Sequence, residues 1–563
     1  MERVTPWLGR TSAQFSQHTA TGLHGPGPLD ELHPPLTERD AMIEAEACLQ
    51  CGGPGQPAPC VSACPTGIDI PGFIRDIAQG VPVEAARKIF SANILGASCA
   101  RVCPVQVLCQ GQCVLHKEGR RAIQIGLLQR FATDHALEED ADILPPVQDC
   151  IRTQSVAVIG AGPSGLACAS ELARLGYPVT VYESREIAGG LITHGIAPYK
   201  QIIDPLPAEV ERIRRLGVTF HFNVSIGKEV TIEQLRRAHH AIFLGVGMGE
   251  DMPARIPGEE LPGVFDSLPF VEALKFSFTE QLSIRSPIAV IGGGNTAIDV
   301  AREAVRMGAA DVQMLYRRTQ DQMPAYKHEI EEALAEGVKI IELVAPLEIL
   351  GNGRVSGVRC NRMRLGKADA SGRPRPEPIP GSEFTIEVHT VIKAIGQRPR
   401  DEFFAAFGVQ TKDGKVTVNA DLQTSDPTCF AGGDCLSGGS TVVAAVRDGK
   451  RAAHGIDRFL TGHPRPPAAI LPPKHVQSDN GTIRHYQGDY ALNTAPALCK
   501  GCDICVKGCP TDTLALDVQG HIVVKDVGTC VFCGICEARC PDFAIWTARG
   551  HSARALPNIE VPT

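Results

Sequence analysis

Short apolar runs that end in glycines and lead into helical patterns recur through the middle of the chain. Ser155–Ile159 is one such run, rich in β-branched residues; a helical segment ending near Gly176 and a second run, Val179–Tyr182, follow it. Ile288–Ile291 starts the same series of elements, with Val312–Tyr316 as its second run. Short strands that alternate with helices are typical of parallel βαβ units. We therefore predict two Rossmann-like α/β domains in this part of the chain.

The glycines after the first strand of each unit indicate dinucleotide binding. In the first unit they form Gly160-Ala-Gly162-Pro-Ser-Gly165, and the second strand delivers Glu183. Such glycines let the backbone approach a pyrophosphate at a helix N-terminus, and the acidic residue binds ribose hydroxyls. Strand, helix and acid together are a strong signal. The first unit is therefore predicted to bind a dinucleotide.

The second unit differs at the end of its second strand. Its turn reads Gly292-Gly-Gly294-Asn-Thr-Ala297, but Arg317-Arg318 stands where an acid would favour NAD(H). Arginine can pair with a 2′-phosphate, so the pattern favours NADP(H). The alternative is that both are ordinary surface arginines.

A third glycine motif lies late in the chain. Thr424–Phe430 is followed by Ala431-Gly-Gly433-Asp434, which resembles the second FAD motif of the flavoprotein disulfide reductases. In that superfamily the aspartate holds the ribityl chain, and the next helix, here from about Thr441, points its N-terminus at the flavin. The first unit is thereby expected to bind FAD, with the NAD(P) unit inserted into it. The redox-active cysteine pair of that superfamily is missing, because Cys168 falls within a helix of small residues and is expected to be packed core.

The candidate nucleotide-binding residues come from these motifs and their surroundings. They are Gly160, Gly162, Ser164, Gly165, Glu183, Gly190, Leu191, Gly292, Gly294, Asn295, Thr296, Arg317, Arg318, Gly396, Gly433, Asp434 and Thr441.

Composition narrows the class of protein. The 563 residues are 43% hydrophobic and carry a net charge of −8, which allows several cores and gives no basic footprint for nucleic acid. No stretch approaches the length of a membrane span, and Met1–Arg10 has no apolar signal core. We expect a cytoplasmic protein, in which cysteines serve metal or redox chemistry more often than disulfides.

The 21 cysteines are concentrated at the two ends of the chain. Eight lie between Cys48 and Cys113, eight between Cys499 and Cys540, and only five between these groups. The C-terminal group contains C-x2-C-x2-C-x3-C-P twice, the pattern of bacterial two-cluster ferredoxins, in which the fourth cysteine of each run binds the other cluster. The pattern assigns one 4Fe-4S cluster to Cys499, Cys502, Cys505 and Cys540, and the other to Cys530, Cys533, Cys536 and Cys509. The alternative, paired zinc sites, uses similar C-x2-C spacing.

The N-terminal cysteines follow no ferredoxin repeat, and there a family resemblance is decisive. Residues 45–133, with Ala85-Ala-Arg-Lys-Ile-Phe90 and Ile125-Gly-Leu-Leu-Gln-Arg-Phe-Ala132, resemble the N-terminal cluster domain of dihydropyrimidine dehydrogenase. The middle of the chain is similar to the glutamate synthase small subunit, through Gly190-Leu-Ile-Thr-His-Gly-Ile196, Tyr316-Arg-Arg318, Met323-Pro324 and Ala431-Gly-Gly-Asp434. Together the two resemblances cover residues from about 40 to 460.

The resemblance implies two further 4Fe-4S clusters, one of them with a glutamine ligand. Carried over by position, one set is Cys48, Cys51, Cys60 and Cys113, and the other is Cys64, Cys103, Cys109 and Gln129. Cys99 then has no cluster and is expected to be a buried spare thiol. Eight residues separate Cys51 from Cys60, and their glycines and prolines indicate an enlarged loop.

The predicted fold is therefore a multidomain α/β protein with two nested Rossmann-like domains and an iron–sulfur domain at each end. The expected domains are an α-helical two-cluster domain (1–150), a discontinuous FAD domain (151–285 and 395–460), an NAD(P) domain (286–394), a linker (461–486) that includes a Pro-rich stretch from His463 to Pro473, and an α+β ferredoxin-like domain (487–563).

The function implied is electron transfer for a larger enzyme. Both related families join this module to a catalytic centre, whereas only a short tail follows Trp546 and nothing resembles an amidotransferase or a thiamine-diphosphate domain. We expect direct hydride transfer between the nicotinamide and FAD, with no catalytic side chain, and electron transfer along four clusters. The expected partner is the catalytic part of a thiamine-diphosphate 2-oxoacid:acceptor oxidoreductase. The alternatives are an NAD(P)H-to-ferredoxin reductase or glutamate synthase small subunit, and, from another class, an electron-relay or scaffold protein.

Overall fold

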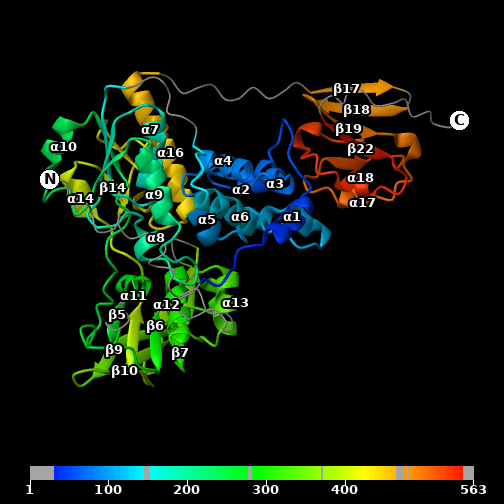
Figure 1. Cartoon of the computed structure of the whole chain (residues 1–563). Coiled ribbons are helices and arrows are strands. Elements are labelled where there is room, and N and C mark those ends of the chain that lie inside the picture. Colours follow the sequence, from blue (N-terminus) through cyan, green and yellow to red (C-terminus); the bar gives the residue numbers. More distant parts are fainter. Residues whose placement is uncertain are drawn as a thin grey trace.

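The computed structural model describes residues 31–144, 152–276, 282–368, 372–463, 474–479 and 481–549. Figure 1 shows a central group of N-terminal helices in blue, with the two nucleotide-binding units on one side and the C-terminal unit, in orange and red, on the other. None of the helices in this described part of the chain has both the length and the apolar character needed to cross a bilayer.

The N-terminal unit is helical, as predicted. Its helices are α1 (Glu38–Glu46), α2 (Pro59–Ala63), α3 (Ile70–Ala78), α4 (Pro82–Ala92), α5 (Gly96–Val102) and α6 (Ile125–Glu138), with 3-10 turns η3 (Gln110–Gln112) and η4 (Val114–Glu118). The apolar faces of the longer helices share one core around Phe73, Phe90 and Leu128. The side chain of Asp69 caps α3 by accepting from the Gly72 N–H at 3.1 Å. This core holds together the loops and helix ends that carry the cysteines.

The first nucleotide-binding unit is built on a parallel five-stranded sheet in the order β16-β4-β1-β2-β3. The strands are β1 (Val156–Ile159), β2 (Val179–Tyr182), β3 (Thr219–His221), β4 (Ala241–Leu244) and β16 (Cys429–Ala431), and the helices are α7 (Pro163–Arg174), α8 (Leu191–His194), α9 (Leu206–Arg215), α10 (Ile232–Ala238), α14 (Asp401–Ala406), α15 (Asp434–Ser437) and α16 (Val442–Thr461). A short hairpin of β14 (Thr411–Lys412) and β15 (Lys415–Val416) lies outside this sheet. Because β16 pairs with β4, the late segment of the chain completes the first sheet, as the third glycine motif predicted.

The second unit is a separate parallel sheet in the order β5-β13-β6-β7-β8. Its strands are β5 (Val264–Asp266), β6 (Ile288–Ile291), β7 (Val312–Tyr316), β8 (Lys339–Glu342) and β13 (Thr390–Lys393), with helices α11 (Ser267–Lys275), α12 (Asn295–Arg306) and α13 (Lys327–Ala335) and the 3-10 turn η6 (Gln320–Gln322). An antiparallel layer of β9 (Val344–Gly351), β10 (Val355–Ala368), β11 (Pro374–Pro378) and β12 (Phe384–Glu387) is attached to it. The predicted multidomain α/β class, with two parallel sheets, is confirmed.

The C-terminal unit is a small α+β fold. An antiparallel sheet in the order β17-β18-β19-β22 comprises Lys474–Asp479, Thr482–Gln487, Tyr490–Thr494 and Ile545–Arg549. Next to it lie the hairpin of β20 (Leu514–Leu516) and β21 (Ile522–Val524), helices α17 (Ile504–Lys507) and α18 (Ile535–Arg539), and turns η7 (Pro496–Leu498) and η8 (Val527–Thr529). β17 and β18 fall in the segment expected to be linker. Their mostly polar, partly exposed residues give a weak strand pattern, so the pairing of β18 with β19, and of β17 with β18, decides their structure.

Two predicted boundaries lie partly or wholly outside the described residues. These are Pro145-Pro146, before the first nucleotide motif, and residues 464–473 of the Pro-rich stretch that begins at His463.

Candidate functional site

The first glycine motif forms the tight turn between β1 and α7. Gly160 has φ +96°, and a Cβ there would lie 2.5 Å from the Gly245 carbonyl oxygen. A Cβ on Gly165 would lie 1.9 Å from the Gly160 oxygen, so this glycine lets the helix pack against the strand. Gly162 instead has open space beside it, with its nearest neighbour, the Gly190 Cα, 3.9 Å away from where a Cβ would be. The turn therefore leaves room at the helix N-terminus where a pyrophosphate would bind.

Glu183 closes this turn from the end of β2. Its carboxylate accepts the Ala161 N–H at 2.7 Å and the Arg185 N–H at 2.9 Å, and the side chain is buried. Gly190, with φ +54°, and Leu191, the first residue of α8, lie on the facing side of the turn. The structure thus brings together the predicted ribose-binding acid and the glycine turn.

The late motif reaches the same place from the other end of the chain. A Cβ on Gly433, where φ is +83°, would lie 2.8 Å from the Ser164 Oγ of α7. Asp434 accepts the Ser440 N–H at 3.0 Å, and burial raises the pKa of its carboxyl. Thr441 caps α16 through its side chain, which accepts the Ala444 N–H at 3.3 Å. Three segments far apart in sequence therefore form one cradle, and its open turn, its two acidic side chains and its helix N-termini fit FAD.

The second glycine turn has the same construction. Gly292 has φ +147°, and a Cβ there would lie 2.2 Å from the Ala394 oxygen, whereas a Cβ on Gly294 would meet nothing within 4 Å. Asn295 fixes the first turn of α12 because its Oδ1 accepts the Tyr326 N–H at 2.9 Å; Thr296 follows it and is half-buried. Gly396, with φ +109°, lies just beyond β13. These residues fit a nicotinamide dinucleotide.

The two arginines after β7 have different surroundings. Arg317 is exposed. Arg318 is buried, and its Nε donates to the Pro374 carbonyl at 2.9 Å. Only Arg317 therefore has a guanidinium that is exposed at the end of this strand.

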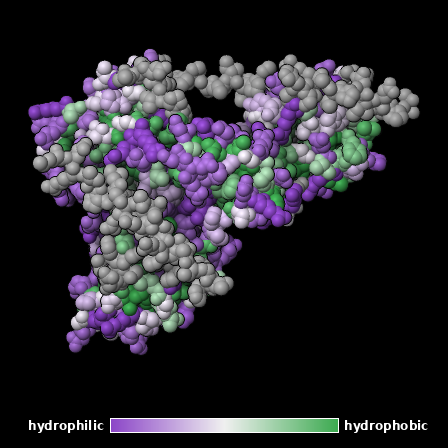
Figure 2. All heavy atoms as spheres, viewed as in Figure 1, coloured by the Kyte–Doolittle hydropathy of each residue, from purple (hydrophilic) through white to green (hydrophobic). Residues whose placement is uncertain are grey.

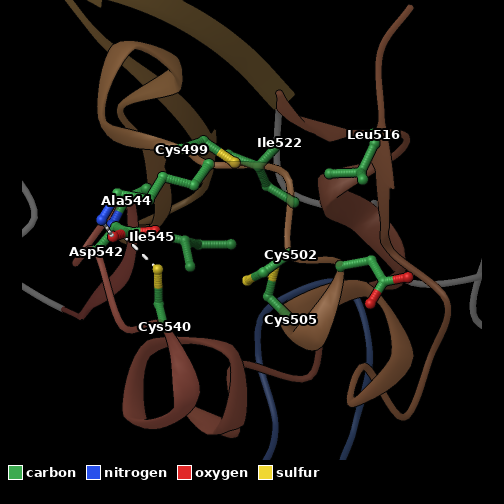
Figure 3. Close-up of a pocket in the computed structure, with 11 residues that line it drawn as sticks. Cys499, Cys502, Cys505, Leu516, Ile522, Cys540, Asp542, Ala544 and Ile545 are labelled. Atoms are coloured by element: carbon green, nitrogen blue, oxygen red, sulfur yellow. Dashed lines mark hydrogen bonds and ion pairs between the residues drawn. The ribbon is translucent and has the colours of Figure 1, made fainter. Parts of the chain in front are cut away.

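In the C-terminal unit the cysteines surround two cavities. Cys499, Cys502, Cys505 and Cys540 line the first, and Figure 3 shows them arranged around a common space. Cys509, Cys530, Cys533 and Cys536 line the second. Each set takes three cysteines from one run and the fourth from the other, as the ferredoxin pattern predicted. The first set reaches the surface, because Cys502 is exposed.

Backbone N–H groups already point at several of these sulfur atoms. Ala544 N–H donates to the Cys540 Sγ at 3.2 Å, Thr513 N–H to the Cys509 Sγ at 3.3 Å, and Phe532 N–H to the Cys530 Sγ at 3.4 Å. Hydrogen bonds to sulfur are one of the features that tune iron–sulfur clusters. Burial raises the pKa of the Cys505 thiol to about 11, with the nearby Cys540 as the next cause. A metal would hold such thiols deprotonated, so donors and surroundings fit a cluster.

The N-terminal cysteines form two neighbouring sets. The pKa of Cys60 is raised by burial and then by Cys48, Cys109 and Cys113, and the pKa of Cys51 is raised by burial and, among other thiols, by Cys48, Cys60 and Cys113. The pKa of Cys109 is raised to about 12 by burial and then by Cys64. The Cys103 N–H donates to the carbonyl of the buried Cys99 at 3.0 Å, and the pKa of Cys103 is raised by Cys99, by burial, and then by Cys109 and Cys64. The thiols of both predicted sets thus lie in one group, in which Cys109 raises the pKa of Cys60 across the sets, and Cys99 lies one helical turn before Cys103.

Gln129 is buried on α6. Its Nε2 donates to the Gly96 carbonyl at 2.7 Å, at the start of α5, the helix that ends just before Cys103. This bond fixes the side-chain amide and leaves its Oε1 as the atom that can bind iron. A ligand role for Gln129 therefore stays a prediction.

Two residues that support these sites carried no signal in the sequence. Asp448 accepts the Gly433 N–H at 3.3 Å, and Glu209 of α9 accepts the Ala97 and Ser98 N–H groups at the start of α5 at 2.8 and 3.2 Å. Both belong to ordinary helical patterns, and the partners of Glu209 lie more than 100 positions away. Only the tertiary fold identifies them.

Comparison with known proteins agrees with this geometry. A family model for pyridine nucleotide-disulphide oxidoreductases matches residues 154–449, one for dihydropyrimidine dehydrogenase domain II, 4Fe-4S cluster, matches 27–141, and one for a 4Fe-4S dicluster domain matches 491–541. The glutamate synthase [NADPH] small chain of Escherichia coli is 36% identical over 76% of this chain and 93% of its own length.

Two further relatives have an additional region that this chain does not match. The NADP(+)-dependent formate dehydrogenase subunit beta of Moorella thermoacetica is 36% identical over 72% of this chain and 60% of its own length. The NADPH-Fe(3+) oxidoreductase subunit beta of Geobacter sulfurreducens is 38% identical over 72% of this chain and 64% of its own length. Their names describe both as subunits of oxidoreductases. The chain itself belongs to the glutamate synthase small-chain family of pyridine nucleotide-disulphide oxidoreductases, as an FAD- and iron–sulfur-dependent NAD(P)H oxidoreductase subunit that carries a C-terminal 4Fe-4S dicluster domain.

Proposed function

We propose that this subunit exchanges electrons between NADP(H) and a separate catalytic subunit, through FAD and four 4Fe-4S clusters. When bound, FAD exchanges a hydride with the nicotinamide and single electrons with the clusters. The observation that carries the proposal is the pair of four-cysteine cavities in the C-terminal unit, one of which reaches the surface at Cys502.

The ligand sets proposed are those of the sequence, and the geometry supports each. The outer C-terminal set is Cys499, Cys502, Cys505 and Cys540; the inner one is Cys530, Cys533, Cys536 and Cys509. The N-terminal sets are Cys48, Cys51, Cys60 and Cys113, and Cys64, Cys103, Cys109 and Gln129. Because a ligand thiol must lose its proton, the buried thiols with raised pKa values bind iron with proton release.

The two nucleotide sites bind and orient FAD and the nicotinamide coenzyme, and no side chain takes part in the hydride transfer. The turn at Gly162, the buried Glu183 and the half-buried Asp434 hold FAD, and the turn at Gly294 holds the pyrophosphate of the nicotinamide coenzyme. The exposed Arg317 contacts the 2′-phosphate. Arg318 stabilises the segment after β7 through its hydrogen bond to the Pro374 carbonyl. The relatives named for NADPH or NADP(+) support this choice of coenzyme.

For the partner we propose the catalytic part of a thiamine-diphosphate 2-oxoacid:acceptor oxidoreductase, with electrons flowing from the 2-oxoacid toward NAD(P)+. Such enzymes release single electrons, which a ferredoxin-like outlet accepts. Figure 2 shows hydrophobic residues on the visible face of the C-terminal unit, and near the outer set Ile504 is 40% and Phe543 is 79% exposed. An exposed apolar surface beside a redox site suits docking of another protein.

Purification from the native cell under anaerobic conditions tests this proposal. A 2-oxoacid oxidoreductase subunit should co-purify, and the complex should reduce NADP+ only when a 2-oxoacid is supplied. A chain truncated before Lys474 should still reduce dyes with NADPH but should lose partner-dependent turnover. Co-purification of an amidotransferase-type large subunit instead, with glutamate formation, would replace this partner by that of a glutamate synthase.

A further inference from the structure

The N-terminal and C-terminal iron–sulfur units are in direct contact through the enlarged loop between Cys51 and Cys60. The Gly52 N–H donates to the Val531 carbonyl at 2.7 Å. This bond joins the residue after one candidate ligand, Cys51, to the residue after another, Cys530. In Figure 1 the C-terminal unit accordingly lies beside the N-terminal helices. It lies away from most of the FAD unit, although α16 of the FAD unit is the helix that precedes it in sequence.

Glycines allow this close approach. A Cβ on Gly53 would lie 2.5 Å from the Phe532 ring, and a Cβ on Gly55 would lie 1.7 Å from the Gln487 amide nitrogen. Phe532 is 1% exposed and Gln487 is fully buried, so the loop lies against packed parts of the C-terminal unit. A side chain at Gly53 would have to displace a ring that is fixed in a core. The two surfaces are therefore complementary only while position 53 has no side chain.

The contact also places two cysteine sets next to each other. Cys51 directly precedes Gly52, whose N–H is bonded to the Val531 carbonyl, and Val531 lies between Cys530 and Cys533 of the inner C-terminal set. Cys51 is thus a neighbour of the inner C-terminal set as well as a member of its own. The outer set, with the exposed Cys502, lines a separate cavity.

We propose that residues 52–59, here called the docking loop, are an intramolecular docking element that fixes the ferredoxin-like unit on the N-terminal unit and holds Cys51 beside the inner C-terminal set. The inference rests on the proposed function, in which both sets bind clusters. It differs from the arrangement suggested by the Pro-rich segment, in which the C-terminal unit would be a separate domain on a tether. The docking loop makes the two units one body, and it leaves the outer set as the surface for the partner.

Two substitutions in the full-length, cluster-loaded chain test the docking loop. Gly53→Val adds a side chain against Phe532, and Gly55→Phe adds one in the middle of the loop, farther from the cysteines. Gln56→Val is the matched control, because Gln56 lies in the same loop and is exposed. The measurements are the radius of gyration by small-angle X-ray scattering, and the magnetic coupling between clusters in the EPR spectrum of the reduced protein.

Both loop variants should have a larger radius of gyration and weaker magnetic coupling, whereas Gln56→Val should match the unmodified chain. The double variant Gly53→Val/Phe532→Leu should regain the compact form, because the smaller side chain makes room for valine. The results should be the same at all protein concentrations, since the contact is intramolecular. An unchanged shape and coupling in both loop variants would overturn the proposal, as would an unmodified chain whose magnetic coupling disappears on dilution. Failure of the proposed function would appear separately, as missing iron or flavin in the unmodified chain.

Discussion

At the scale of single residues, we expect the two arginines after β7 to have different roles: Arg317 in the choice of coenzyme and Arg318 in stability. Arg317→Ala should raise the KM for NADP(H) about ten- to hundredfold, the range that the loss of a hydrogen bond to a charged group of about 1.5–3 kcal/mol gives, and should leave the KM for NAD(H) nearly unchanged. Lys327→Ala, which removes a charge from an exposed side chain of the same unit, is the control. Arg318→Ala should instead lower thermal stability, since Arg318 is buried against Pro374. An equal effect of Arg317→Ala on both coenzymes would contradict the phosphate contact.

Gln129 provides a second test at this scale. Gln129→Cys should change the EPR spectrum of one cluster while the iron content stays the same, because a thiolate replaces an amide oxygen at one iron. Gln79→Cys, at an exposed position at the end of α3, should leave the spectrum as it is. A spectrum of Gln129→Cys identical to that of the unmodified protein would make Gln129 a structural residue that serves only its bond to Gly96.

At the scale of elements, helix α5 is held by a buried carboxyl group of the FAD unit. Burial raises the pKa of Glu209 to about 7, against the bonds from Ser98 and Ala97 that lower it. The folded protein therefore binds a proton there that the unfolded chain releases, and the stability this contributes, roughly 3 kcal/mol, is complete below about pH 4.5 and lost as the pH rises through about 7.

Glu209→Gln should therefore reduce the fall in apparent melting temperature between about pH 5 and 7.5, measured anaerobically at one scan rate. Part of the fall should remain, because burial also raises the pKa of Glu303 to about 7. Glu402→Gln, at an exposed position on α14, is the matched control. A variant as pH-dependent as the unmodified chain would show that Glu209 keeps its charge in the fold.

Some of these elements could be predicted from the sequence, and others could not. The predicted runs at Val179–Tyr182, Ile288–Ile291 and Val312–Tyr316 have the bounds of β2, β6 and β7, because local apolar pattern and glycine turns determine these elements. The hairpin of β17 and β18 was missed, since it depends on pairing with a strand that its own polar sequence does not indicate. The different surroundings of Arg317 and Arg318, and the contact of the docking loop, likewise depend on distant segments. The cluster and coenzyme ligands themselves stay predictions that the geometry supports.

At the scale of the whole molecule, the described residues place cysteine sets in the order that a relay between the FAD unit and the surface requires. Helix α5, which precedes Cys103, is bound by Glu209 of the FAD unit, the residue after Cys51 is hydrogen-bonded to Val531 of the C-terminal unit, and Cys502 is exposed. The nucleotide cradles lie at one end of this order and the outer C-terminal set at the other. This order is the one that the proposed function requires, with the nicotinamide coenzyme at one end and the partner protein at the other.

The ratio of iron to flavin in the anaerobically purified full-length chain tests the central claim most directly. Four 4Fe-4S clusters and one FAD predict about sixteen iron atoms per flavin. A ratio of about eight, with fully occupied sites, would show that only one of the two cysteine-rich ends binds clusters, and would contradict the account.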